Sequence, residues 1–136
     1  MTWDRLTLLA SIVLGATGST MFSAEPNWAG EYADKKFLNS QAVFQMSIQQ
    51  SGNSIQVAFD AAYVDAHGAA PEGDGQAKIT GANALEFKWE DSFKNSGTGT
   101  IKRTAEGVTV SMNPTRVVDS RCLVFYGQNI RLKRMK

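Results

Sequence analysis

The segment AVFQMSIQQSGNSIQVAFDAAYV, residues 42–64, holds two runs of alternating residues separated by a short polar turn. The apolar face carries Ala42, Phe44, Met46 and Ile48 in the first run, and Ile55, Val57, Phe59 and Ala61 in the second. A period of two is typical of strands that bury one face. The SGN turn at 51–53 between two such runs indicates a tight connection. The segment therefore predicts an antiparallel β-hairpin.

The same alternation recurs along the chain, and no long stretch has helical spacing. Further strands are expected at 27–32, 76–80, 84–90, 97–104, 108–113 and 121–134, with the longest loop at 65–75. Most connections are short, so consecutive strands should be antiparallel neighbours. Closing eight such strands into a ring removes exposed edges. We predict an all-β fold, an eight-stranded antiparallel up-and-down β-barrel, with a two-sheet β-sandwich as the alternative.

The alternation also predicts which side chains point inward. They are Phe44, Met46, Ile48, Ile55, Val57, Phe59, Ile79, Leu85, Phe87, Trp89, Val108, Val110, Met112 and Leu123. Barrels of eight strands are either filled by side chains or hold one small ligand. With so many bulky groups we expect a mostly filled centre and a small apolar pocket near one mouth. The aromatic residues expected there, as ligand contacts or as caps of the core, are Tyr32, Tyr63, Trp89, Phe93 and Tyr126.

The N-terminus differs from the rest of the chain. Arg5 is followed by an apolar stretch from Leu6 to Ala16 and then by small residues, the plan of a secretory signal peptide. We predict an apolar leader helix that is a signal peptide at residues 1–24 and a barrel domain at 25–136, with an uncleaved anchor as the alternative. A cleaved leader implies a secreted or periplasmic protein, expected to be a monomer without a stable membrane anchor.

The residues WAG at 28–30, on the first expected strand, and IRLKR at 130–134, on the last, resemble the pattern of the calycins, which include lipocalins, fatty-acid-binding proteins and avidins. The resemblance implies that Trp28 lies across the closed end of a lipocalin-like barrel. It also implies that Arg131 or Arg134 packs over this tryptophan and binds backbone carbonyls. The chain departs from lipocalins in lacking a helix after the barrel and a disulfide. The biotin-binding residues of avidins have no clear match here.

Composition and residue counts argue against most catalytic and metal chemistry. The net charge is +1, so no overall field attracts nucleic acid. Cys122 and His67 are the single residues of their types, too few for a structural zinc site. Cys122 lies in a strand-forming run and is expected to be a buried thiol. We therefore predict a non-enzymatic protein with no cofactor and no metal site.

Two polar segments were candidates for chemistry. Glu90 and Asp91 begin a glycine-rich turn, but adjacent residues of a strand point to opposite sides, so this turn is interpreted as a corner between strands. The loop 65–75 holds Asp65, His67, Glu72 and Asp74, whose spacing does not match a calcium-binding loop.

Two functions from different classes remain open. One is an exported barrel that binds a small apolar ligand at its mouth. The other is a protein–protein interaction module that contacts an envelope protein through its outer loops, such as an inhibitor of a cell-wall hydrolase. A filled barrel with a projecting loop favours the second function, and an accessible apolar cavity favours the first.

Overall fold

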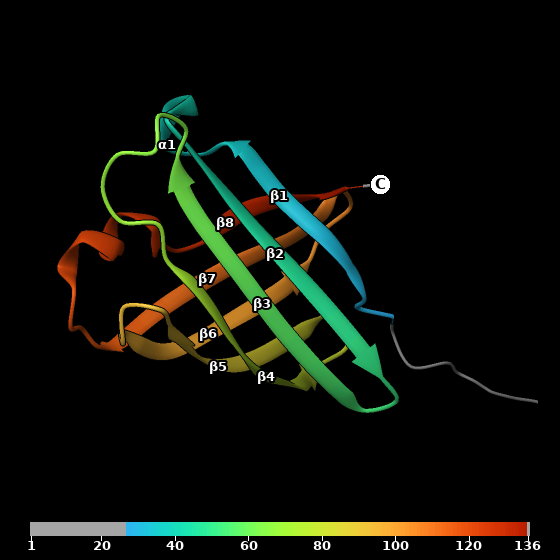
Figure 1. Cartoon of the computed structure of the whole chain (residues 1–136). Helices are drawn as coiled ribbons and strands as arrows, with labels where there is room; N and C mark the ends of the chain where they lie inside the picture. Colours follow the sequence, from blue (N-terminus) through green and yellow to red (C-terminus); the bar gives the residue numbers. More distant parts are fainter. Residues whose placement is uncertain (1–26, 136) are drawn as a thin grey trace, which may run out of the picture.

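The computed structural model describes residues 27–135, in which eight strands follow one another around a closed barrel (Figure 1). The strands are β1 (Gly30–Lys36), β2 (Ala42–Ser51), β3 (Ser54–Tyr63), β4 (Glu72–Gly81), β5 (Ala84–Asp91), β6 (Ser96–Arg103), β7 (Gly107–Arg116) and β8 (Ile130–Met135). Every strand pairs antiparallel with its sequence neighbours, and β1 pairs with β8. The predicted up-and-down barrel is confirmed, and the sandwich alternative is wrong.

The hairpin predicted from residues 42–64 is the most extensively paired part of the wall. β2 and β3 are in register from Ala42↔Tyr63 to Ser51↔Ser54. The pairing that closes the ring is much shorter. It joins residues 31–33 of β1 to residues 133–135 of β8. The barrel therefore has one extensive hairpin and one short closing seam.

The interior is filled because bulky side chains on some strands face glycines on their neighbours. A Cβ atom on Gly99 of β6 would lie 2.5 Å from the ring of Phe87 on β5. A Cβ atom on Gly73 of β4 would lie 2.5 Å from the ring of Phe59 on β3. An aromatic ring thus occupies the space that a neighbouring side chain would need. The glycines at 97 and 99 serve the wall of the barrel, as the corner interpretation of this segment expected.

Two predicted inward residues lie at the surface instead. Ile79 is 37% exposed because the β3–β4 pairing ends at Ile55↔Ala77, so no β3 residue lies beside it. Leu123 is also 37% exposed because residues 120–125 are not part of a strand. Both positions have the right alternation but lack the neighbouring strand that would cover them.

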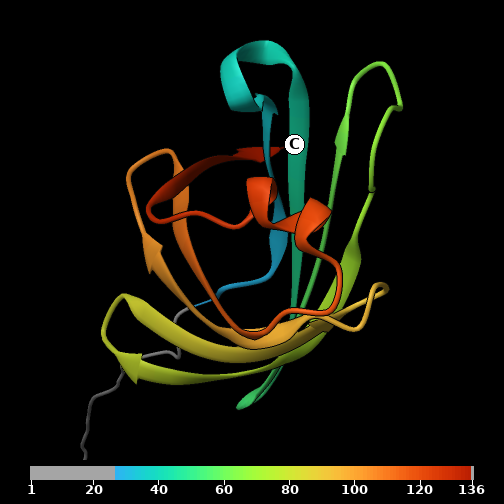
Figure 2. The same ribbon diagram turned by 90° about the vertical axis from the view of Figure 1, so that its left-hand side faces the viewer.

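The predicted strand at 121–134 is half wrong. Ser120–Phe125 form the 3-10 helix η2, and only Ile130–Met135 pair as β8. Figure 2 shows this segment between β7 and β8 lying across one end of the barrel. With roughly three residues per turn, η2 directs Cys122 and Phe125 into the barrel and leaves Leu123 outside. We call residues 117–129 the plug.

A short left-handed turn, α1 (Phe37–Ser40), joins β1 to β2, with φ values of 55°, 57° and 70° at Leu38, Asn39 and Ser40. The signal peptide predicted at residues 1–24 lies outside the described residues. Within residues 27–135, no helix has the length and apolar character needed to cross a bilayer.

The packing of aromatic rings against glycines is testable by adding one methyl group. Gly99→Ala should lower the free energy of unfolding by about 1–3 kcal/mol, because the new Cβ overlaps the Phe87 ring and approaches Ser111 O to 2.9 Å. The measurement is urea denaturation. The matched control is Gly81→Ala, whose Cβ would meet no atom closer than Ala84 Cβ at 3.8 Å. Equal stability of the two variants would contradict the packing argument.

Candidate functional site

The predicted ligand contacts Trp89 and Tyr126 are part of the filled interior. Trp89 is 3% exposed and Tyr126 is 8% exposed, and their rings lie 4.8 Å apart between centroids. The Phe59 ring meets both edge-on, at 5.7 Å and 5.9 Å. Trp89 Nε1–H donates to Thr98 O at 2.8 Å. These rings pack against one another and leave no face free for a ligand in this conformation.

A buried polar network lies beside these rings, and the sequence did not predict it. The Asp91 carboxylate is 4% exposed and accepts hydrogen bonds from Phe93 N, Asn95 N, Asn95 Nδ2 and the Tyr126 hydroxyl, the last at 2.6 Å. Four donors replace the water that this carboxylate loses on burial. Burial, together with the bond to Asp91, raises the pKa of Tyr126 above its usual value.

Asn95 connects this network to the plug. Its side chain is fully buried, and its Oδ1 accepts from Val118 N at 2.7 Å and from Asp119 N at 2.9 Å. Its Nδ2 donates to Asp91 and to Asp119 O. Tyr126 provides the second attachment, at the other end of η2. Asn95, Asp91 and Tyr126 therefore form a latch that holds the plug across the mouth.

The plug also buries the single cysteine. Cys122 is inaccessible to solvent, and burial raises the pKa of its thiol to about 11. The reactive form of cysteine is the thiolate, which this environment disfavours. The chemistry available to Cys122 in the folded protein is thus that of a small apolar side chain.

The other candidate contacts lie around the plug. The Tyr63 ring packs 5.3 Å from Phe125 and stacks at 4.0 Å on His67. His67 pairs through Nδ1 with Asp65, and this hydrogen bond lowers the pKa of the Asp65 carboxyl. Phe93 is partly buried, with the guanidinium of Arg121 5.7 Å from its ring centre. Tyr63, Trp89, Phe93 and Tyr126 thus gather at one end of the barrel, whereas Tyr32 belongs to the opposite end.

Exposed apolar side chains concentrate at the plugged end. Among the described residues, seven large apolar side chains are exposed, and five of them lie here: Val64, Val117, Val118, Leu123 and Val124. Four belong to the plug, and Val64 directly follows Tyr63, the last residue of β3, whose ring packs on Phe125. We call these five residues the apolar end surface. Clustering of apolar groups, unlike single exposed residues, is typical of an interaction surface.

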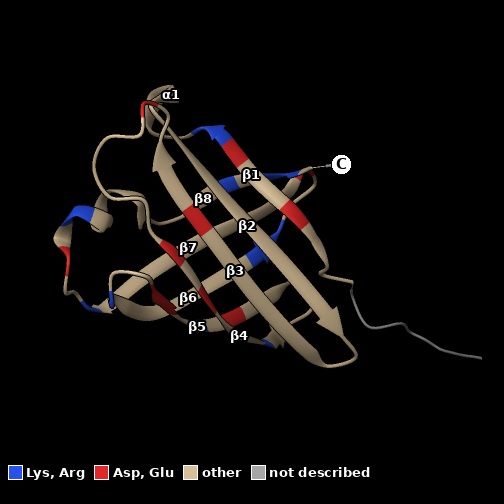
Figure 3. Cartoon of the chain, viewed as in Figure 1, with Lys and Arg blue, Asp and Glu red and all other residues tan. Residues whose placement is uncertain are grey.

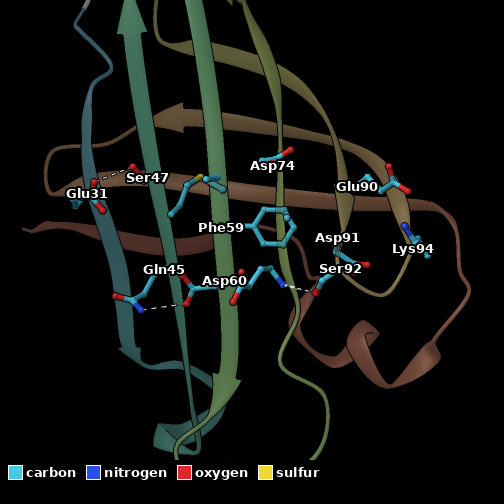
Figure 4. A pocket seen from close by; sticks show the side chains of 14 residues that line it. Glu31, Gln45, Ser47, Phe59, Asp60, Asp74, Glu90, Asp91, Ser92 and Lys94 are labelled. Carbon is cyan, nitrogen blue, oxygen red and sulfur yellow. Dashed lines mark hydrogen bonds between the residues drawn. The ribbon is translucent and has the colours of Figure 1, made fainter.

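An acidic hollow of about 520 Å³ adjoins this end on the outer face of β1–β5. Figure 4 shows acidic side chains from several strands around it, and Figure 3 marks the acidic positions on these strands in red. Asp60 faces Glu72 across β3 and β4, and Asp74 faces Glu90 across β4 and β5. Like charges directly opposite each other destabilise a sheet. Lys94, in the β5–β6 turn beside the plug, also lines the hollow.

At the far end, Trp28 is fully buried, but the arginine over it is not the predicted one. The guanidinium of Arg103, on β6, lies 4.1 Å from the Trp28 ring centre. Arg134 instead donates to Ala29 O at 2.8 Å and to the Tyr32 hydroxyl at 3.2 Å. Arg131 is exposed on the outer face of β8. The last strand thus supplies the bond to a backbone carbonyl, and β6 supplies the stacked arginine.

Within residues 27–135, no three His, Cys, Asp or Glu side chains are grouped so that they could hold a metal ion. Of the acids in the expected loop 65–75, only Asp65 lies in a loop, since Glu72 and Asp74 belong to β4. No protein-family model, no curated protein and no solved structure matches this chain. The fold and its surfaces are therefore the basis for a functional proposal.

The latch is testable by a double-mutant cycle. Asn95→Ala should lower the free energy of unfolding by about 3 kcal/mol, because it removes one of the four donors to Asp91 and leaves two plug N–H groups without a partner. Tyr126→Phe should cost about 1–2 kcal/mol through loss of the bond to Asp91. Gln56→Ala, on the exposed face of β3, is the control. Urea denaturation should show that the two latch effects are not additive, and simple additivity would contradict a shared network.

Proposed function

We propose that this protein is an exported, non-enzymatic binding barrel of calycin type that contacts a partner protein through its plugged end. The observation that carries the proposal is the gathering of five exposed apolar side chains over a mouth whose interior is already filled. A filled interior favours recognition on the outside. The barrel then acts as a rigid support, and the latch fixes the plug in one conformation before the partner binds.

The chemistry of the partner follows from what lies next to the apolar end surface. The acidic hollow contains two like-charge cross-strand pairs, which a positively charged partner would relieve. The matching surface is apolar at its centre and carries lysine or arginine on one flank. An envelope hydrolase with such a surface is one partner of this kind, and the barrel would then act as its inhibitor.

A carrier of a small apolar ligand is the second candidate. It is supported by the plug, which crosses the mouth without pairing as a strand and could therefore move without breaking the barrel. In this role the side chains of Phe125 and Tyr126 would move out of the barrel, and the ligand would occupy the space they leave. The two candidates differ in what a free apolar molecule does to the protein.

The proposal is tested by a photo-crosslinking residue placed at Val118, with the same residue at exposed Ile79 as the control. In the producing cell, position 118 should capture one protein that position 79 does not capture. Excess unlabelled protein should compete, and excess Val124→Asp protein should compete at least about tenfold less well. The partner, purified separately, should bind directly. Equal capture at both positions, or competition unaffected by Val124→Asp, would refute a protein contact at this end.

The filled mouth predicts no response to apolar ligands. Palmitate and a hydrophobic dye should leave the midpoint of thermal unfolding unchanged, because the buried side chains pack against one another in the space that such a ligand would need. Asn95→Ala, which loosens the plug, is the informative comparison. A concentration-dependent rise in the midpoint of the wild-type protein would favour the carrier over the interaction module.

Export is tested by the intact mass of the protein recovered outside the cytoplasm. A cleaved leader predicts a mass that lacks the first 18 to 24 residues, the range in which small side chains allow cleavage. The full-length mass would mean that the apolar segment is retained as an anchor.

A further inference from the structure

The closing seam between β1 and β8 leaves part of both strand edges without a partner. Pairing stops at Ala33↔Lys133. Beyond this pair β1 continues through Asp34, Lys35 and Lys36, and β8 continues back through Leu132 and Arg131 to Ile130. In the described register none of these residues pairs across the seam. Figure 1 shows β1 and β8 diverging from this point toward the α1 end of the barrel.

A groove occupies this opening. Its volume is about 820 Å³, and both strands line it, together with the β6–β7 turn and the start of β7. Its lining includes Ala33, Val108 and Leu132, all of them buried. Four exposed basic side chains stand along it: Lys35, Lys36, Arg131 and Lys133. Asp34 and Glu106 also line it, so basic groups outnumber acidic ones by four to two.

The two edges differ in what they offer. On β1, the N–H of Lys36 already donates to the Asp34 carboxylate at 2.9 Å. On β8, Ile130, Arg131 and Leu132 pair with Val110, Thr109 and Val108 of β7 on one side only. An unpaired strand edge is a template for another strand, and basic side chains along it keep it from pairing with basic or neutral chains. The β8 edge is therefore the one open to a ligand.

We propose that this groove, which we call the seam groove, binds an extended acidic segment of another protein by strand addition along β8. Main-chain hydrogen bonds to Arg131 would hold the segment, because in the β7–β8 register the N–H and C=O of Arg131 point away from β7, whereas those of Ile130 and Leu132 point toward it. Alternate side chains would lie on the apolar floor formed by Ala33 and Leu132, and the remaining carboxylates would pair with Lys35, Arg131 and Lys133. This site is distinct from the acidic hollow, because it has the opposite charge and its lining comes from β7, β8, the β6–β7 turn and the far half of β1 and not from β2–β5.

An acidic peptide fits the groove better than other anions. A nucleic acid or a bilayer also attracts lysine and arginine, but neither supplies main-chain donors and acceptors for a strand edge. The groove is also bordered by carboxylates at Asp34 and Glu106, which would repel a continuous anionic surface. A peptide can place single carboxylates beside the basic groups and avoid these two acids.

The test uses the whole protein and a synthetic peptide of alternating valine and glutamate. Amide chemical shifts recorded during titration should change along residues 130–133 and 34–36 and not along the β2–β3 hairpin. Three reference ligands separate the alternatives: the same peptide with valine and lysine, the valine–glutamate peptide with alternate backbone N–H groups methylated, and a short single-stranded DNA. The lysine peptide should not bind. Loss of binding on N-methylation is expected for strand addition, because methylation removes donors and keeps the charge.

A charge-reversal pair checks the assignment to this groove. Lys35→Glu with Arg131→Glu should weaken binding of the valine–glutamate peptide by roughly tenfold or more. Lys88→Glu with Lys102→Glu changes the net charge equally on the outer face of other strands and should have little effect. All four side chains are exposed, so both variants should fold. Absence of binding, equal binding of the methylated peptide, tighter binding of DNA, or equal loss in the two variants would each overturn the proposal. None of these outcomes bears on the plugged end.

Discussion

The structure depends on one steric constraint: an aromatic ring on one strand lies opposite a glycine on the neighbouring strand. Phe59 needs the space above Gly73, and Phe87 needs the space above Gly99. This match lets eight strands curl tightly around a dense centre, because a Cβ at either glycine would push the wall outward. The core also accounts for where recognition can occur. Since rings fill the middle, the surfaces that remain for binding are the ends and the outer face.

A buried polar network holds the plug, and the plug in turn presents the exposed apolar side chains at this end of the barrel. Asp91 and Asn95 are buried, yet nearly every hydrogen-bonding group they present is used, so the cost of burial is offset. The benefit is a fixed position for a segment that has no strand partner of its own. Valines exposed on a fixed segment are suited to rigid docking, whereas the same residues on a mobile loop would first have to be ordered.

The sequence alone was sufficient to predict the number of strands and their closure into a barrel, because alternation and short turns are local signals. It misassigned residues 121–125, since RCLVF has the composition of a strand, while the residues on either side of it, Asp119 and Tyr126, are held by Asn95 and Asp91, far away in the chain. Arg103 was missed for the same reason, because its contact with Trp28 joins β6 to the start of the chain. Asp91 was interpreted as part of a corner between strands, although its place after Trp89 on the inward side of the alternation was a signal of burial.

The register at the closing seam makes a circular permutant of the barrel feasible, in which the strands follow one another in a different order along the chain. Glu31 stands opposite Met135, so the first and last strands run side by side. A short linker between them would give a continuous ring, which could be cut open elsewhere, for example at the solvent-exposed Gly52 turn between β2 and β3. In a circular permutant of this kind β3 would be the first strand and β2 the last, so the most extensively paired hairpin would be split between the two ends of the chain. Comparing its refolding rate with that of the natural order would reveal whether this hairpin must assemble before the others.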